Sequence, residues 1–255
     1  RLRTDTIGVF LRQTAEDRVY GMIRNWQELR KNNPDLIIAV TGCMPGRDRS
    51  GTLRKRIKGV DLYFAIDELP LFPKWIRELN PDIIEDKQNN QSLQGELDES
   101  YLKITPKPSV KYQAYVTIQT GCNNFCTYCV VPYARGEERN RTVKEIIAEI
   151  KRLADKGCLE VTLLGQVVNN YQAPDPDSYS SKNPFKNKDD FAALLWEING
   201  VKGIKRIHFT APDPQHFSEF QIKALTLPKM SNYLHLPAQS GNDEILKKMN
   251  RKYKA

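Results

Sequence analysis

Three cysteines lie within eight residues of this chain, in the run Gly121-Cys122-Asn-Asn-Phe-Cys126-Thr-Tyr-Cys129. The run directly follows a predicted strand at residues 114–119, and parallel α/β folds place their sites at the carboxyl ends of strands. The chain has five cysteines in all, and nothing near its start argues for export. Clustered cysteines in such a chain favour metal ligation over disulfides. The spacing therefore predicts a fold that presents a metal-binding loop at the end of a strand.

The spacing also bears on which metal is bound. Three thiolates hold three irons of a [4Fe–4S] cluster and leave the fourth iron without a protein ligand. Zinc is the competing interpretation, but zinc sites favour paired C-x2-C spacings and a fourth ligand. Here one spacing is three residues, and no histidine lies nearby. We therefore predict an iron–sulfur cluster on Cys122, Cys126 and Cys129.

The front of the chain alternates helix and strand. An apolar stripe predicts a helix from Thr14 to Asn33, and a fully apolar run predicts a strand at 36–41. A short basic helix at 53–58 and a strand at 60–65 follow. A strand that is apolar on both faces is typical of a covered parallel sheet. We expect a small open parallel α/β domain over residues 1–84, incomplete at its start, and a polar, proline-containing linker over 85–111.

The strand–helix alternation resumes over residues 112–255. Thr142 and Glu145 form a capping-box pattern that predicts the start of a helix. The expected strands are 114–119, 159–164, 206–210 and 233–236, and the expected helices are 142–156, 189–199 and 217–225. Strands and helices in this order predict an α/β fold with a parallel barrel. A whole barrel takes roughly six to eight such units, so we expect a partial barrel, incomplete at the C-terminus.

The charge distribution indicates an anionic partner. The net charge is +8, from 39 basic and 31 acidic residues, and six of the basic residues lie between positions 47 and 58. Such a cluster attracts nucleic acid by counterion release, although a solvated helix face has the same composition. No apolar run approaches the ~20 residues of a membrane span. We expect a cytoplasmic monomer that has no membrane partner.

Several segments resemble one family. The cysteine loop and its Val-Val-Pro-Tyr-Ala-Arg-Gly continuation closely resemble the radical-SAM methylthiotransferases, specifically the MiaB-type tRNA enzymes. The likeness extends to Arg12-Gln-Thr-Ala-Glu-Asp-Arg18, Val40-Thr-Gly-Cys-Met44, Arg139-Asn-Arg141, Val161-Thr-Leu-Leu-Gly-Gln166, Phe209-Thr-Ala-Pro212 and Leu234-His-Leu-Pro-Ala-Gln-Ser-Gly241. It therefore covers nearly the whole chain.

The resemblance implies a radical-SAM barrel and a reaction. S-adenosylmethionine (SAM) binds the open iron, and an electron donor such as a flavodoxin or ferredoxin supplies the electron that cleaves it. A second [4Fe–4S] cluster in the front domain supplies sulfur. The implied product is a methylthio group on C2 of isopentenylated adenosine beside the tRNA anticodon. Sibling enzymes act on threonylcarbamoyl-adenosine or on a ribosomal-protein aspartate.

The resemblance and the positions at strand ends also imply roles for single residues. Cys43 matches a ligand of the second cluster. Tyr128 resembles an aromatic that lies near the adenine of SAM. Further cofactor contacts are expected from Gly165, Gln166, Asn169, Gln239 and Ser240. The basic cluster separately predicts RNA-phosphate contacts from Arg54 and Arg56. Contacts with the SAM carboxylate or with RNA phosphate are expected from Arg135, Arg139 and Arg141.

The chain departs from the family pattern at two positions. Val9 stands where the family usually has a second-cluster cysteine, and Val167 stands where it commonly has asparagine. The second cluster therefore lacks ligands as the sequence stands, and we expect a truncated chain. Cys158 is predicted to be a core residue, and His208 and His235 to be interior histidines.

These departures keep two rival functions open. One is a radical-SAM enzyme with a single cluster, and the other is an inactive fragment that only binds RNA through its basic residues.

Overall fold

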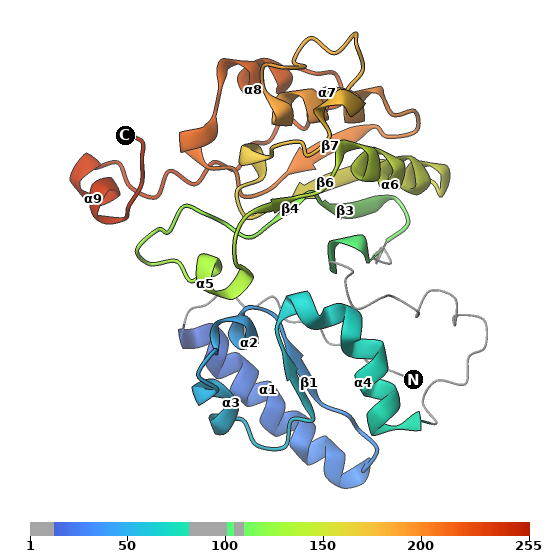
Figure 1. Ribbon diagram of the computed structural model, residues 1–255, viewed down its shortest axis with the longest axis vertical. Coiled ribbons are helices and arrows are strands. Elements are labelled where there is room, and N and C mark those ends of the chain that lie inside the picture. The colour runs from blue at the N-terminus through green and yellow to red at the C-terminus, as the bar shows by residue number, and fades with distance from the viewer. Residues whose placement is uncertain (1–12, 82–100, 105–109) are drawn as a thin grey trace. The chain divides into compact units, whose positions relative to one another are not determined.

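The computed structural model describes residues 13–81, 101–104 and 110–255 (Figure 1). The chain divides into two compact units. Unit 1 comprises Arg1–Thr105 and Cys129–Gly136, and unit 2 comprises Pro106–Tyr128 and Glu137–Ala255. The predicted linker lies mostly outside the described residues, so its boundaries stay predictions. Within the described ranges, no helix is long and apolar enough to cross a membrane.

Unit 1 is a small parallel α/β arrangement. Its elements are α1 (Gln13–Asn32), β1 (Ala39–Thr41), α2 (Cys43–Arg47), α3 (Thr52–Arg56), β2 (Leu62–Phe64), η1 (Ile66–Leu71), α4 (Phe72–Leu79), η3 (Tyr101–Lys103) and α5 (Val131–Arg135). β1 and β2 pair in parallel, with Val40 opposite Tyr63. The core buries Val19 and Ile23 of α1 against Ile38 and Val40. The apolar stripe of α1 therefore packs on the sheet, as the sequence predicted.

Unit 2 contains a three-stranded parallel sheet. Its elements are β3 (Gln113–Thr117), β4 (Gln119–Thr120), β5 (Arg139–Asn140), α6 (Val143–Asp155), β6 (Glu160–Leu164), η4 (Val168–Asn170), η5 (Pro176–Ser178), α7 (Asp190–Gly200), β7 (Arg206–Phe209), η6 (Pro214–His216), α8 (Glu219–Ala224) and α9 (Asp243–Lys248). The strand order is β3-β6-β7, and a separate antiparallel pair joins β4 to β5. The order of strands and helices confirms the predicted α/β class.

One hydrophobic core holds unit 2 together. α6 contributes Ile146 and Ile150, which are fully buried with Val161 of β6. Thr142 accepts a hydrogen bond from the amide of Glu145, whose carboxylate accepts one from the amide of Thr142, each at 3.2 Å. This is the predicted capping box, so the start of α6 and its inward face are both confirmed.

The predicted strand at 233–236 is wrong. Beyond β7 the described chain makes a single parallel bridge, between Ile207 and Met230. Tyr233 is 63% exposed, and its ring lies 5.7 Å from that of His208. The apolar residues of this segment are not buried, so no strand forms there. His235, predicted to be interior, is exposed for the same reason.

Candidate functional site

The cysteine loop, residues 121–128 of unit 2, begins at the end of β4. Gly121 has φ 75°, and a Cβ at this position would overlap the carbonyl oxygen of Glu137. Only glycine combines this backbone conformation with such a close approach. Asn123 Oδ1 accepts a hydrogen bond from the amide of Glu138 at 3.2 Å. The start of the loop is therefore fixed against the chain that follows α5.

The two thiols of the loop and that of Cys129, the next residue, have the chemistry that a [4Fe–4S] cluster requires. Cys122 and Cys126 are buried, Cys129 is half-buried, and none of the five cysteines is in a disulfide. The amide of Asn124 points at Cys122 Sγ and that of Val131 at Cys129 Sγ, each at 3.5 Å. Backbone N–H groups directed at sulfur stabilise thiolates and tune clusters. The donor set therefore fits an iron–sulfur cluster.

A ready-made metal cage is not part of the described structure. Among the described residues, no three His, Cys, Asp or Glu side chains are grouped so that they would hold a metal ion. Cys122 and Cys126 belong to unit 2, whereas Cys129 belongs to unit 1. The ligand set therefore stays a prediction that rests on spacing and donor chemistry.

Hydrogen bonds join the segment that follows α9 to the cysteine loop. Thr127 donates its amide to the carbonyl of Met249 at 3.2 Å. The side-chain amide of Asn250 donates to the carbonyls of Asn124 and Phe125 at 3.1 and 3.0 Å. These contacts join positions more than 120 residues apart, and the sequence pattern did not predict them.

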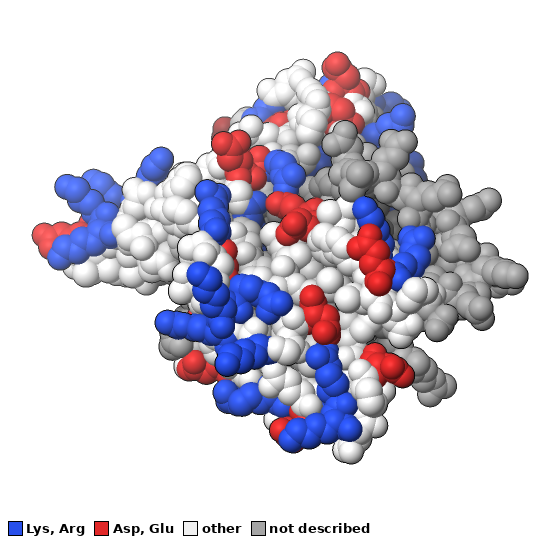
Figure 2. Space-filling view, turned by 60° about the horizontal axis from the view of Figure 1, so that its bottom comes forward, with Lys and Arg blue, Asp and Glu red and all other residues white. Residues whose placement is uncertain are grey.

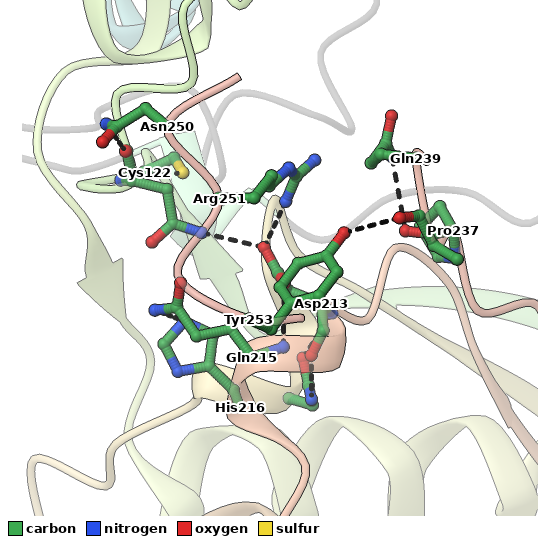
Figure 3. Close-up of polar contacts among 12 residues, drawn as sticks. Cys122, Asp213, Gln215, His216, Pro237, Gln239, Asn250, Arg251 and Tyr253 are labelled. Atoms are coloured by element: carbon green, nitrogen blue, oxygen red, sulfur yellow. Dashed lines mark hydrogen bonds and ion pairs between the residues drawn. The ribbon is translucent and has the colours of Figure 1, made fainter. Parts of the chain in front are cut away.

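Arg251 bonds both to Tyr128 and to the buried carboxylate of Asp213, and Figure 3 shows its contact with Asp213. Its Nη2 donates to Tyr128 Oη at 2.8 Å, and its guanidinium lies 5.9 Å from the centre of that ring. Its Nη1 forms an ion pair with Asp213, whose side chain is 5% exposed. Asn124 donates to the same carboxylate oxygen at 3.1 Å. Burial acts to lower the pKa of Arg251, but Tyr128, Asp213 and Cys126 outweigh it and raise the pKa.

Asn169 is used inside the protein. Its Oδ1 accepts from the amide of Asp213 at 2.8 Å, and its Nδ2 donates to the Asp213 carbonyl at 3.0 Å and to Gln221 at 3.3 Å. With these bonds the buried side chain joins η4 to Asp213, the residue before η6, and to Gln221 of α8. Its predicted cofactor contact stays untested, and the structure gives the side chain a bridging role instead. Asp213 was not among the site residues predicted from the sequence. An acidic residue shortly after a predicted strand could have indicated it.

The end of β6 lies beside Gln119. A Cβ at Gly165 would lie 3.0 Å from Gln119 Oε1, which also accepts from the amide of Val167 at 3.2 Å. Gln119 Nε2 is buried and has no partner among the described residues. Val167, in the place of the family's asparagine, is itself buried. Gln166 is half-buried, so its predicted cofactor contact is sterically open.

Gln239 and Ser240 make local contacts in the loop before α9. Gln239 has φ 65° and donates to the carbonyl of Pro237 at 3.4 Å. Ser240 Oγ accepts from the amide of Asn242 at 3.1 Å. Gln239 is exposed, and the expectation that both residues follow a fourth strand falls with that strand.

In unit 1, Cys43 lies at the start of α2 and is contacted by α5. Arg135 Nε donates to Cys43 Sγ at 3.2 Å. A Cβ at Gly46 would overlap the carbonyl oxygen of Ala134, so the two helices approach closely. Burial acts to lower the pKa of Arg135, but the sulfur of Cys43 outweighs it and raises the pKa. Arg135 is thus directed at a sulfur rather than at solvent.

The other predicted RNA-binding arginines differ in exposure. Arg141 forms an ion pair with Glu149 at 2.7 Å, and the two side chains are 11% and 6% exposed. Arg54 donates to the carbonyls of Ile57 and Val60, each at 2.9 Å. Both guanidinium groups are therefore occupied within their units. Arg56 and Arg139 are exposed.

A basic surface surrounds α3. Figure 2 shows lysine and arginine side chains gathered on one side of unit 1. The exposed cations of the 47–58 cluster are Arg49, Lys55, Arg56 and Lys58. We call these four residues the basic patch. Arg47 is not a member, because it forms an ion pair with Glu16.

The chain is similar to a group of curated proteins that share one name. It is 38% identical over 250 residues to the tRNA-2-methylthio-N(6)-dimethylallyladenosine synthase of Finegoldia magna, with 95% of this chain and 50% of that protein aligned. The synthase of the same name from Clostridium botulinum is 40% identical over 249 residues, with 95% and 51% aligned. The one from Thermoanaerobacter sp. is 41% identical over 254 residues, with 95% and 49% aligned. The chain spans about half the length of these relatives.

The fold is similar to that of a solved enzyme. The cobalamin-dependent S-adenosylmethionine radical enzyme OxsB superposes with a TM-score of 0.55 in its apo form, at 14% identity, over 94% of this chain and 36% of that one. Its form with aqua-cobalamin and S-adenosylmethionine bound superposes with a TM-score of 0.54. At this identity the likeness concerns the fold alone.

The family match starts in β3, includes the whole cysteine loop and continues to the last residue. The sequence model described as the Radical SAM superfamily matches residues 116–255, more than half of the chain. This chain therefore belongs to the radical SAM superfamily.

Proposed function

We propose that this protein is a radical-SAM methylthiotransferase that modifies C2 of isopentenylated adenosine in tRNA. The observation that carries the proposal is identity of 38–41% along 95% of the chain to synthases named for that product. The similarity includes the front unit as well as the cysteine loop, which a generic radical-SAM barrel would not explain. A cytoplasmic site of action and an external one-electron donor belong to the same proposal.

The cysteine loop would hold the radical-generating cluster through Cys122, Cys126 and Cys129. When bound, a [4Fe–4S] cluster supplies the electron that cleaves SAM. The protein's own residues set the shape of the loop and direct backbone N–H groups at the cysteine sulfurs. Gly121 sets the loop's path, and amide groups at 124 and 131 point at two of the sulfurs.

A second cluster is expected in unit 1, with Cys43 as the ligand that the sequence supplies. Arg135 would hold this sulfur through the hydrogen bond that its Nε donates to Cys43 Sγ. Val9, at a position where a further ligand is expected, lies outside the described residues. Because valine offers no donor atom, a single-cluster radical-SAM enzyme is the second candidate function.

Anaerobic reconstitution with iron and sulfide tests the first part of the proposal. The unsubstituted chain should turn brown and cleave SAM to 5′-deoxyadenosine. Cys126→Ala should lose both properties, because it removes one of three ligands. Cys158→Ala is the matched control, since Cys158 is a buried thiol in the core of unit 2 that should not bind iron. Full iron in the Cys126 variant would refute the ligand assignment.

The substrate is tested separately by mass spectrometry of digested tRNA after incubation with SAM and reductant. A 2-methylthio derivative of isopentenyladenosine is the expected product. SAM cleavage with unmodified tRNA and one cluster's iron would favour the single-cluster enzyme. Strong tRNA binding without any SAM cleavage would favour a protein that only binds RNA.

A further inference from the structure

The cysteine loop is bonded to its surroundings along its whole length. All five of its non-cysteine residues after Gly121 make a hydrogen bond to a residue outside the loop, and these residues are Asn123, Asn124, Phe125, Thr127 and Tyr128. Four of the five bond to the segment at 249–251. The contacts to the segment at 249–251 therefore restrain most of the loop.

Two residues in this contact adopt left-handed backbone conformations, which asparagine tolerates but phenylalanine does not favour. Phe125 has φ 48° and Asn250 has φ 58°, and the side chain of Asn250 donates to the Phe125 carbonyl. Left-handed conformations are costly for residues with a Cβ and persist only where neighbouring contacts impose them. The left-handed backbone of Phe125, whose carbonyl accepts this bond, indicates that the segment at 249–251 helps to impose the geometry of the loop.

Arg251 is the charged residue of this contact (Figure 3). Its guanidinium bonds in two directions, with Nη1 on Asp213 and both Nη2 and Nε on the hydroxyl of Tyr128, at 2.8 and 3.3 Å. Its side chain is 12% exposed. A planar, always-charged fork presents its donors in a fixed geometry, which suits this pair of contacts better than the compact ammonium group of lysine. Neither Arg251 nor Asp213 has a role in the proposed function as described so far.

We propose that Arg251 is a positioning residue for the radical-SAM cluster: it locks the cysteine loop by tying Tyr128 to Asp213, and its charge stabilises the reduced cluster. This inference rests on the proposed cluster at Cys122, Cys126 and Cys129. The potential of an iron–sulfur cluster depends on nearby charge, hydrogen bonds and exposure. Removing a cation beside the loop should therefore lower the potential.

The test compares Arg251→Gln with Lys254→Gln, which removes the same charge from an exposed side chain nearby. After reconstitution, two quantities are measured: the rate at which a chelator removes iron, and the midpoint potential from a titration followed by electron paramagnetic resonance. Substitution of groups that orient metal ligands typically weakens metal binding about 10–100-fold. We expect Arg251→Gln to lose iron about tenfold faster, at a lower potential, and Lys254→Gln to match the unsubstituted chain. Arg251→Lys keeps the positive charge, so its potential should match that of the unsubstituted chain. Its iron should still be lost faster than from the unsubstituted chain.

Equal behaviour of Arg251→Gln and Lys254→Gln in both measurements would overturn this inference and leave the proposed function standing. A failure of the unsubstituted chain to hold iron would overturn the proposed function, and the inference with it. If circular dichroism shows that Arg251→Gln does not fold, Tyr128→Phe decides, because it deletes only a hydroxyl on a half-exposed ring. Faster iron loss at unchanged potential is expected from this variant, and an unchanged rate of loss would overturn the inference.

Discussion

A side chain at Gly121 should disturb the cysteine loop. In Gly121→Ala, the left-handed backbone alone costs about 1–3 kcal/mol, and the new Cβ would overlap the Glu137 carbonyl. We expect a lower Tm and poor iron retention, measured by thermal unfolding and by iron content after reconstitution. Gly200→Ala is the control, since its Cβ would meet nothing within 4 Å at the end of α7. Equal stability of the two variants would contradict the prediction.

The loop's ligands could be predicted from the sequence, but its supports could not. Cysteine spacing is local, so Cys122, Cys126 and Cys129 stand out without a structure. Arg251 meets Tyr128 across 123 residues and Asp213 across 38. In the sequence Arg251 is one of several cations near the end of the chain, a pattern that indicates a solvated face. Only the folded chain shows that it is nearly buried.

Among the elements, those with their own local signals were predicted and those that need a neighbour were not. α6 has both a capping box and an apolar stripe, and both are confirmed. The run at 233–236 is as apolar as a strand but has no partner in the described structure. β7 bonds instead to Lys229 and, through its Ile207 carbonyl, to Ser231. Periodicity measures the tendency of a segment and not the availability of an adjacent strand.

The buried ion pair between Arg141, which follows β5, and Glu149 of α6 leads to a prediction about these elements. Arg141 also donates to the carbonyl of Thr117 at 2.8 Å, so it bonds to both Glu149 and the end of β3. Glu149→Gln should destabilise the apo chain by about 3–5 kcal/mol in urea unfolding, because it leaves a buried charge unpaired. Removing the exposed pair in α8 by Glu219→Gln should cost about 0–1 kcal/mol.

Arg141→Met separates the internal role from the RNA role. A large loss of stability with unchanged tRNA binding by the remaining folded protein would assign Arg141 to the core. Weaker tRNA binding at full stability would instead support the original expectation of a phosphate contact.

At the scale of the whole molecule, the similarity of the two units to known proteins comes from different comparisons. The superfamily match covers residues 116–255, whereas the resemblance of unit 1 comes from the longer relatives. The net charge of +8 also has a local origin, because four exposed cations of the basic patch surround one short helix. Composition alone could not distinguish an RNA-binding face from a solvated one. The structure shows which cations of the cluster are exposed and could contact RNA, and these form the basic patch.

Reversal of charge on the basic patch tests whether tRNA binds there. Lys55→Glu combined with Arg56→Glu changes two exposed residues and leaves Arg54, which bonds to the carbonyls of Ile57 and Val60, in place. Each lost phosphate contact should reduce the slope of log affinity against log salt by roughly 0.7–0.9, so the double variant should lose about two such increments. Lys182→Glu with Lys202→Glu gives the same change in net charge at exposed positions of unit 2. Equal slopes for the two double variants, measured across a salt series with purified tRNA, would return the patch to the role of a solvated helix face.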